Sequence, residues 1–281
     1  MILLKTDFNP VSEFTDFINH PYVNLPFGLD INKAVVYMWM AAALAIILTL
    51  LVTRRGLQVR PSGPQTTAEV IYEVCEQQIA RAGLPEEGMK IWFPYVATAF
   101  VFIWMMNLIG FIPLPFGEEH VDLFGLSVPQ LQIYAATANL SVTLTLTLVT
   151  ILASHAEGIR YNGVVGYFKS WMPSGMPDFG LKTAPLIILI AVIEVISQFV
   201  RIVSLSFRLF FNLLAGHLVI AVFLGMGALI GGTAFYFIHP IGFAMGVALY
   251  TLEATLIAGL QAFIFASLSA IYIGGAIHPD H

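Results

Sequence analysis

The chain has 281 residues, of which 58% are hydrophobic and 10% are charged, and its formal net charge is −5. Soluble globular domains carry about 25% charged residues, so this composition excludes a domain dissolved in water. The acidic balance offers no basic surface and excludes a nucleic-acid-binding role. The apolar residues form runs of about twenty, which cross a hydrocarbon core of about 30 Å as helices. We therefore expect an all-α membrane protein with a single membrane domain, residues 1–281.

The first part of the chain predicts one span and one helix at the membrane surface. Residues 1–33 lack the basic start and apolar core of a signal peptide. Residues 34–53 are apolar and predict the first span, and a cluster of arginines begins directly after it at Arg54. Residues 61–83 carry apolar and acidic residues on opposite sides of a helix, which is typical of an amphipathic interfacial helix. The single cysteine, Cys75, is interpreted as a packed thiol on this helix.

Two further spans are predicted at residues 91–113 and 131–154. Lysine and arginine number five between positions 54 and 90 and three between positions 160 and 182, against two before the first span and none in the loop 114–130. Basic loops stay on the cytoplasmic side, or on the matrix side in an organelle. The count therefore predicts that the amino terminus lies on the opposite side of the membrane.

The last third of the chain consists of two unusually long apolar stretches, residues 184–230 and 235–277. As one helix, the first would be about 70 Å long, which is more than twice the thickness of the hydrocarbon core. Either each stretch breaks into two spans, or each forms one inclined helix. We favour two long inclined helices that form a hairpin, because Gly231 and Gly232 supply one clear break between them. Pro240 is a candidate for a kink near the start of the second helix.

Three charged residues follow one another at seven-residue intervals in the first of these stretches: Glu194, Arg201 and Arg208. Each interval turns a helix by about −20°, so all three share one stripe. An ionised side chain at the bilayer centre costs about 2.5–3.5 kcal/mol and needs a partner or a function. In one interpretation Glu194 neutralises Arg201, while Arg208 reaches a lipid headgroup. In the interpretation that we favour for Arg208, another helix or another chain supplies its counter-charge, because apolar residues continue well beyond it.

Polar and small residues accompany Arg208. Asn212 follows one helical turn later, and His217 points to roughly the opposite side. On the last predicted helix, Glu253 and Gln261 can face His217 across the hairpin. Small residues that would let another helix approach closely are Ser204, Ser206, Ala215 and Gly216.

The run from Ser204 to His217, SLSFRLFFNLLAGH, resembles the SLxxRLFxNxxAGH signature of subunit a of the rotary F-type ATP synthases. That subunit is the static membrane component beside the rotating c-ring. Other features similar to the family are the runs LQAFIF (260–265), MNLIGFIP (106–113) and TANLSVT (137–143), and the acid Glu194 fourteen residues before the arginine. The resemblance covers nearly the whole chain.

The resemblance implies a site centred on Arg208. In the family this arginine attracts the ionised carboxylate of each passing c subunit and blocks leakage of ions between two offset half-channels. Asn212 and Gln261 would then lie beside it. Glu194, His217 and Glu253 would line the aqueous proton paths. The small residues named above would contact the c-ring.

One position departs from the family pattern. The usual polar residue stands seven positions before the glutamine, which here is Ala254, whereas Glu253 stands eight positions before Gln261. On a regular helix this spacing places Glu253 about 80° away from the direction of Gln261 rather than about 20°.

The resemblance also implies partners and a location. The partners are a c-ring of multiple c subunits, b-type peripheral stalk subunits and the other ATP synthase subunits, all within a lipid bilayer. No cofactor, no metal and no catalytic site of its own are expected. The bacterial plasma membrane is favoured, with the mitochondrial inner membrane as the alternative that the Ala-Gly-His run suggests. The choice between protons and sodium ions depends largely on the c subunit.

Two other classes of function compete with this interpretation. A stand-alone ion-coupled secondary transporter also uses intramembrane charges and broken helices, but the chain shows no internal repeat of its spans. A membrane metalloenzyme would use His217, His239 and Glu253, yet the predicted membrane segments contain no His-x-x-x-His or Glu-x-x-His pair. Histidines expected in loops or at the ends, without a catalytic role, are His20, His120, His155, His278 and His281.

Overall fold

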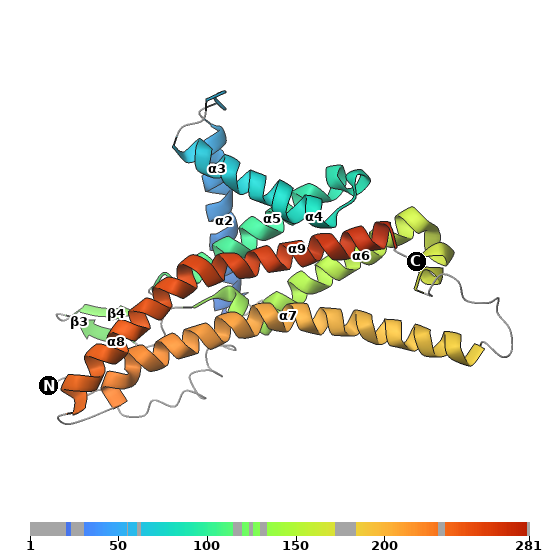
Figure 1. Ribbon diagram of the computed structural model, residues 1–281. Helices are drawn as coiled ribbons and strands as arrows, with labels where there is room; N and C mark the ends of the chain where they lie inside the picture. The colour runs from blue at the N-terminus through green and yellow to red at the C-terminus, as the bar shows by residue number, and fades with distance from the viewer. Residues whose placement is uncertain are drawn as a thin grey trace. The chain divides into compact units, whose positions relative to one another are not determined.

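The computed structural model describes residues 21–23, 31–54, 56–60, 63–114, 120–123, 126–129, 134–171, 184–229 and 234–279. Its elements are mostly helical (Figure 1). The α-helices are α2 (Lys33–Thr53), α3 (Pro64–Glu73), α4 (Arg81–Gly83), α5 (Glu86–Gly110), α6 (Leu140–Lys169), α7 (Ala184–Leu229), α8 (Ala234–Leu252) and α9 (Ala258–Ile277). Two π-helical turns, η2 (Val74–Ala80) and η4 (Glu253–Ile257), and one 3-10 turn, η3 (Ala136–Ala138), complete the helical part.

Two short antiparallel strand pairs lie outside the helices. Strand β1 (Pro21–Val23) pairs with β2 (Ile31–Asn32), and β3 (His120–Leu123) pairs with β4 (Leu126–Pro129). Strands this short add little to the fold, because a single two-stranded hairpin is at best marginally stable alone.

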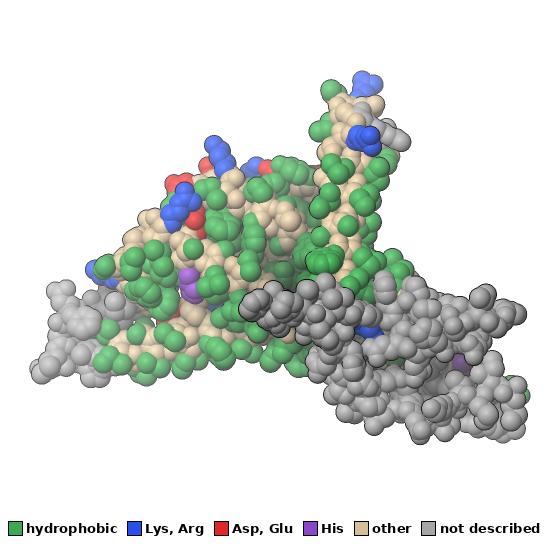
Figure 2. All heavy atoms as spheres, turned by 180° about the vertical axis from the view of Figure 1, so that it is seen from behind, with side chains coloured by type: hydrophobic (Ala, Val, Ile, Leu, Met, Phe, Trp, Pro, Cys, Tyr) green, Lys and Arg blue, Asp and Glu red, His purple; other side chains and the backbone are tan. Residues whose placement is uncertain are grey.

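Five helical segments among the described residues are long and apolar enough to cross a membrane: Lys33–Thr53, Glu86–Gly110, Leu140–Lys169, Ile187–Phe223 and Ile238–Ile277. Hydrophobic side chains also cover most of the described surface visible in Figure 2. A surface of this kind is stable in lipid, where exposed apolar side chains need no burial within the protein. The expected all-α membrane fold with five membrane helices is therefore confirmed.

Helix α7 is one continuous helix of 46 residues, about 70 Å long at 1.5 Å per residue. A helix of this length cannot stand upright within a core of about 30 Å. The structure therefore agrees with the interpretation of one long inclined helix and not with two separate spans. The expected turn at Gly231 and Gly232 lies outside the described residues.

The last helical stretch is also continuous, from Ala234 through η4 to Ile277. Pro240 lies inside α8 without ending it. The irregularity comes later, where η4 begins at Glu253. A π-helical turn contains one more residue than an α-helical turn, and such turns are frequent at functional sites.

The third membrane helix differs from its prediction. We expected a span at residues 131–154, whereas α6 begins at Leu140 and ends at Lys169. Its start is delayed because Asn139 has extended backbone angles (φ −103°, ψ 120°) after the 3-10 turn η3. Beyond position 154 the helix continues to Lys169, and in this part the buried Glu157 is paired with Arg160 at 3.4 Å.

The end of α6 is bent at Gly163, whose φ of 70° favours glycine. Just before the bend, the Asn162 side-chain amide donates hydrogen bonds to the carbonyl oxygens of Ala276 (3.0 Å) and Ile277 (3.3 Å). The last carbonyls of a helix have no partner within the helix. Asn162 therefore caps the carboxyl end of α9 and fixes it against α6.

The chain divides into two compact units. Unit 1 comprises Met1–Ala45, Ile103–Asn139 and Phe210–Leu260, and unit 2 comprises Ile46–Phe102, Leu140–Leu209 and Gln261–His281. In unit 1 the buried Asn107 donates to the carbonyl oxygen of Ala258 (3.0 Å) and accepts from the Thr137 hydroxyl (2.7 Å). This arrangement satisfies buried polar groups on three elements and joins the runs MNLIGFIP (106–113) and TANLSVT (137–143).

In unit 2, helix α9 lies directly against α4. A Cβ placed on Gly83 would come within 2.6 Å of the Ile271 backbone nitrogen, and one on Gly274 would overlap the Gly83 carbonyl oxygen. Glycine at positions 83 and 274 therefore permits a close backbone approach that any side chain would prevent.

The single cysteine, Cys75, is buried on η2, and burial raises the pKa of its thiol to about 11.

We predict that Gly274→Ala destabilises the protein, because its new methyl group meets backbone atoms that no rotamer change can move. Overpacking of this kind costs about 1–3 kcal/mol. Gly275→Ala is the matched control, since a Cβ there has nothing within 4 Å. Thermal unfolding of the two detergent-solubilised variants measures the difference, and equal stability of both would contradict the close contact.

Candidate functional site

Arg208 lies on the exposed side of α7. Within the described part of the chain it forms no ion pair and no hydrogen bond. The neighbouring residues of α7 are apolar, so this part of the helix is suited to contact with lipid or with another membrane protein. An arginine stays charged even in such a place, and the described chain leaves this charge without a carboxylate.

The exposed side of α7 near Arg208 forms a continuous stripe. Its members recur at three- and four-residue intervals, which places them on one face; they are Ser204, Phe207, Arg208, Phe211, Ala215, Leu218, Val219 and Val222. Ser206, which we expected on this face, is only 1% exposed and donates a hydrogen bond to the Ile202 carbonyl oxygen at 2.6 Å. The face therefore includes Ser204 and Ala215 but not Ser206.

The other two charges of the predicted stripe neutralise each other. In unit 2, Arg201 lies 3.9 Å from Glu194, and the Gln198 amide donates a 2.8 Å hydrogen bond to the same carboxylate oxygen. The Arg201 guanidinium also stacks 5.6 Å from the ring centroid of Tyr272, a cation–π contact. Pairing of Glu194 with Arg201 is the first interpretation considered above, and it leaves Arg208 as the unpaired cation of the described α7 residues.

A polar hollow of about 310 Å³ surrounds the Glu194–Arg201 pair in unit 2. Residues from α6, α7 and α9 and from the positions directly after α6 and α9 line it: Ser154, His155, Tyr167, Ser170, Trp171, Glu194, Gln198, Arg201, Ile271, Tyr272, Gly275, Ala276 and Pro279. His155 was expected in a loop, but it lies inside α6 because the helix runs fifteen residues beyond the predicted span. Its place in the same hollow as Glu194 could not be predicted from the sequence, since the two residues approach only through the packing of two helices.

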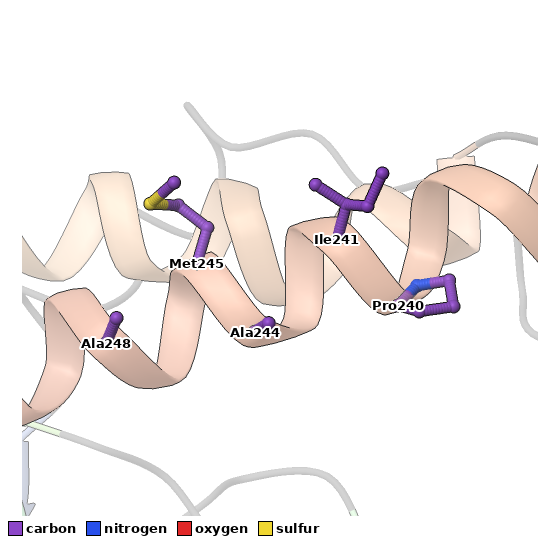
Figure 3. Close-up of a pocket in the computed structure, with 5 residues that line it drawn as sticks. All are labelled: Pro240, Ile241, Ala244, Met245 and Ala248. Carbon is purple, nitrogen blue, oxygen red and sulfur yellow. The ribbon is translucent and has the colours of Figure 1, made fainter.

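A second hollow, of about 450 Å³, is lined by Pro240, Ile241, Ala244, Met245 and Ala248 (Figure 3). These residues belong to one face of α8 and bring no hydrogen-bonding side chain. An ion would lose its hydration there without compensation. This apolar chemistry does not suit an ion path.

Unit 1 contains a buried acid. Glu253 is 3% exposed, and its Oε1 atom has no hydrogen-bond partner. A Cβ on Gly216 would overlap its carboxylate group, so the absence of a side chain at Gly216 makes the room that Glu253 occupies. Gly216 therefore faces the acid inside the chain and does not belong to the exposed stripe of α7.

Two further polar atoms of unit 1 are buried without a partner, Asn212 Nδ2 and His217 Nε2. The His217 ring contacts Phe111 edge-on, with centroids 5.1 Å apart, and the hydroxyl of Tyr250 donates to the Phe111 carbonyl oxygen. A buried group left unsatisfied costs about 1–3 kcal/mol, and native structures keep such groups mainly for function or for bound water. Asn212, His217 and Glu253 are thus candidates for a hydrated path.

The π-helical turn η4 changes the expected direction of Glu253. A spacing of eight residues that contains one inserted residue has the helical phase of seven residues on a regular helix, about 20°. The expected offset of about 80° from Gln261 assumed a regular helix and is wrong for this reason. Gln261 itself is 9% exposed on α9.

The metalloenzyme alternative requires several ligands in one place. Among the residues that the structure describes, no group of three or more His, Cys, Asp or Glu side chains is placed to hold a metal ion.

Comparison with known proteins assigns the family. Residues 35–274 match the model of a family described as ATP synthase A chain. The chain belongs to this family. Its relatives include proteins named ATP synthase subunit a from Maricaulis maris (34% identity; 98% of this chain and 99% of the relative) and Bradyrhizobium diazoefficiens (37% identity; 87% and 88%). A third, from Hyphomonas neptunium, is 36% identical over 90% of this chain and 89% of its own length.

Membership of the ATP synthase A chain family has consequences for the alternatives. The expected resemblance to subunit a is confirmed, and the stand-alone transporter is not favoured. The chain is a membrane protein of the proton-translocating part of an ATP synthase, so other subunits of that complex are its partners.

We predict that Gly216→Ala impairs proton transport without unfolding the protein. The clash involves the end of a flexible side chain, so the Glu253 carboxylate can move while the backbone stays in place. Displacing a reacting group by about 1 Å can cost up to about 100-fold in rate, and we expect at least about a tenfold loss of ATP-driven proton pumping in membrane vesicles.

The double variant Gly216→Ala/Glu253→Asp tests the cause. Aspartate is one methylene group shorter and makes room for the new methyl group, so pumping should recover in part. Wild-type pumping in the single variant would show that the position of the Glu253 carboxylate is unimportant.

Proposed function

We propose that this chain is the static membrane subunit of an F-type ATP synthase and that it forms two half-channels against a c-ring. Protons pass through one half-channel to a c-ring carboxylate and leave through the other after rotation. The observation that carries the proposal is that Arg208 is exposed and forms no ion pair with an acid among the described residues of its own chain. A c subunit carboxylate is the counter-charge that this position lacks.

The strength of this attraction suits a rotating partner. Two opposite unit charges 4 Å apart attract each other by about 4 kcal/mol at an effective dielectric constant of 20. This energy favours the ionised carboxylate locally, and rotation can still separate the pair. Arginine is suited to the position because lysine can lose its proton in an apolar site. A fixed positive charge also repels protons that would pass directly between the half-channels.

We assign the two paths to the two units of the chain. The polar hollow with Glu194 belongs to the path on the side of the basic loops, since Glu194 is the first acid after the basic residues Lys169 and Lys182 that precede α7. The unsatisfied groups of Asn212, His217 and Glu253 belong to the path on the opposite side. Gln261 stands beside Arg208, as the family resemblance implies.

The c-ring contacts the exposed stripe of α7, in which small residues flank the arginine and allow close approach. The b-type peripheral stalk holds this subunit static while the ring turns. We place the protein in a bacterial plasma membrane, because the relatives compared above come from bacteria.

We predict that Arg208→Ala abolishes coupled proton transport, because the c-ring carboxylate loses its counter-charge and protons can leak between the paths. ATP-driven acidification of inverted membrane vesicles measures the effect. Arg81→Ala is the control, since Arg81 is exposed and its ion pair with Glu76 at the surface contributes little. Normal pumping by the Arg208→Ala variant would refute the proposed role.

Cysteine cross-linking tests the contact face. Ser204→Cys should form a disulfide with a cysteine placed on the co-purified small proteolipid, because Ser204 is exposed on the stripe. Ser206→Cys is the matched control, since Ser206 is buried two residues away and should not cross-link. The native Cys75 can remain, because it is buried. Equal yields from both positions would contradict the assigned face.

A further inference from the structure

The polar hollow of unit 2 contains a second protonatable pair that the function proposed above does not use. His155 Nδ1 and the Tyr167 hydroxyl group are hydrogen-bonded to each other, and both line the hollow together with Glu194 and Arg201. Imidazole and phenol groups in hydrogen-bond contact can pass a proton between them. Their common position with Glu194 suggests that they serve the same path.

A bend in α6 brings His155 and Tyr167 together. His155 and Tyr167 are twelve residues apart, and on a straight helix they would be separated by about 18 Å. The bend at Gly163, where φ is 70°, turns the last part of α6 back. Tyr167 then lies against Gly158, where any Cβ would overlap the tyrosine ring. The contact between the two groups therefore depends on glycine at two positions of α6.

Aromatic neighbours hold the pair in place. The Trp171 ring lies 6.2 Å from the His155 ring and 5.7 Å from the Tyr167 ring, measured between centroids. Charged and titratable groups that face the same hollow come from the two other helices: Glu194 and Arg201 from α7, and Tyr272 from α9. Arg201 is paired with Glu194 and stacks on Tyr272, so these three side chains hold one another in the lining of the hollow.

We propose that His155 and Tyr167 form a proton relay between water and the Glu194 carboxylate on the side of the basic loops. The inference rests on the proposed function, because it needs a proton path through this hollow. His155 takes a proton from water on Nε2 and releases its Nδ1 proton to the Tyr167 oxygen. Tyr167 passes its own hydroxyl proton to water in the hollow, from which Glu194 receives one. One proton moves inward, and both groups end neutral.

The relay predicts that proton conduction falls when the titrating group of His155 is removed, even if a hydrogen-bonding side chain stays in its place. A positioned acid–base group contributes about 10²–10⁴-fold to a proton transfer, but water in the hollow provides a parallel route, so we expect about a tenfold loss. The variant His155→Gln keeps a hydrogen-bonding side chain and removes the titrating group. Passive proton conduction through the membrane sector, measured in vesicles stripped of the catalytic sector, should fall about tenfold. The contribution of the His155 imidazole to the pH dependence of that conduction should also be lost.

Chemical rescue separates a relay from a structural role. In His155→Ala vesicles, imidazole added on the side of the basic loops should restore conduction, because it replaces the missing ring. Tyr167→Phe should lose conduction without rescue by imidazole, and Tyr161→Phe, on the exposed part of α6, is its matched control. Loss of conduction in His155→Ala that imidazole does not restore, with an unchanged pH profile in His155→Gln, would show a structural role and overturn the relay.

The proposed function is tested separately by Arg208→Ala in membrane vesicles that retain the catalytic sector. If that variant still couples proton flow to ATP hydrolysis, the proposed function fails, whatever His155 does. If Arg208→Ala is uncoupled as expected and His155→Gln conducts protons at the wild-type rate at every pH, only the relay is overturned.

Discussion

The architecture depends on one permanent positive charge on an apolar helix. The guanidinium group of Arg208 is exposed on α7, and no carboxylate of the described chain neutralises it. An isolated charge in a membrane is unfavourable by several kcal/mol, so this position is stable only beside a partner that supplies a negative charge. Glu194, which stands fourteen residues earlier on the same helix and so about 21 Å away along its axis, does not serve, because Arg201 already neutralises it. The unmatched charge makes this helix part of a larger assembly.

The acids of the proposed proton paths are placed by local backbone features. Gly216 has no side chain, and the Glu253 carboxylate occupies the space beside it. The π-helical turn at Glu253 contains one extra residue, which rotates the direction of that side chain by about 100° about the helix axis. In unit 2, the bend at Gly163 brings Tyr167 to His155 beside the Glu194 pair. Each feature is a small departure from regular helix, and each one moves a protonatable group.

The helical frame could be predicted from the sequence because membrane spans follow directly from apolar runs. The length of α7 and the charged stripe with Arg208 were predicted for the same reason, since both depend only on helical geometry. The start of α6, the burial of Ser206 and the place of His155 were not predicted. They depend on a 3-10 turn, on packing between helices and on the bend at Gly163 that brings Tyr167 to His155.

The sequence by itself determined the fold class, the position of the unmatched arginine and, through the run from Ser204 to His217, the family. These properties are local, because hydrophobicity and helical phase are set by neighbours in the chain. Only the tertiary structure decided that Arg201 pairs with Glu194, that Glu253 is buried against Gly216, and that His155 is hydrogen-bonded to Tyr167. Glu253 meets Gly216 because two helices pack together, and Tyr167 meets His155 because α6 bends at Gly163. The seven-residue spacing of Glu194 and Arg201 permits their pairing but does not require it, so the side-chain positions decide it.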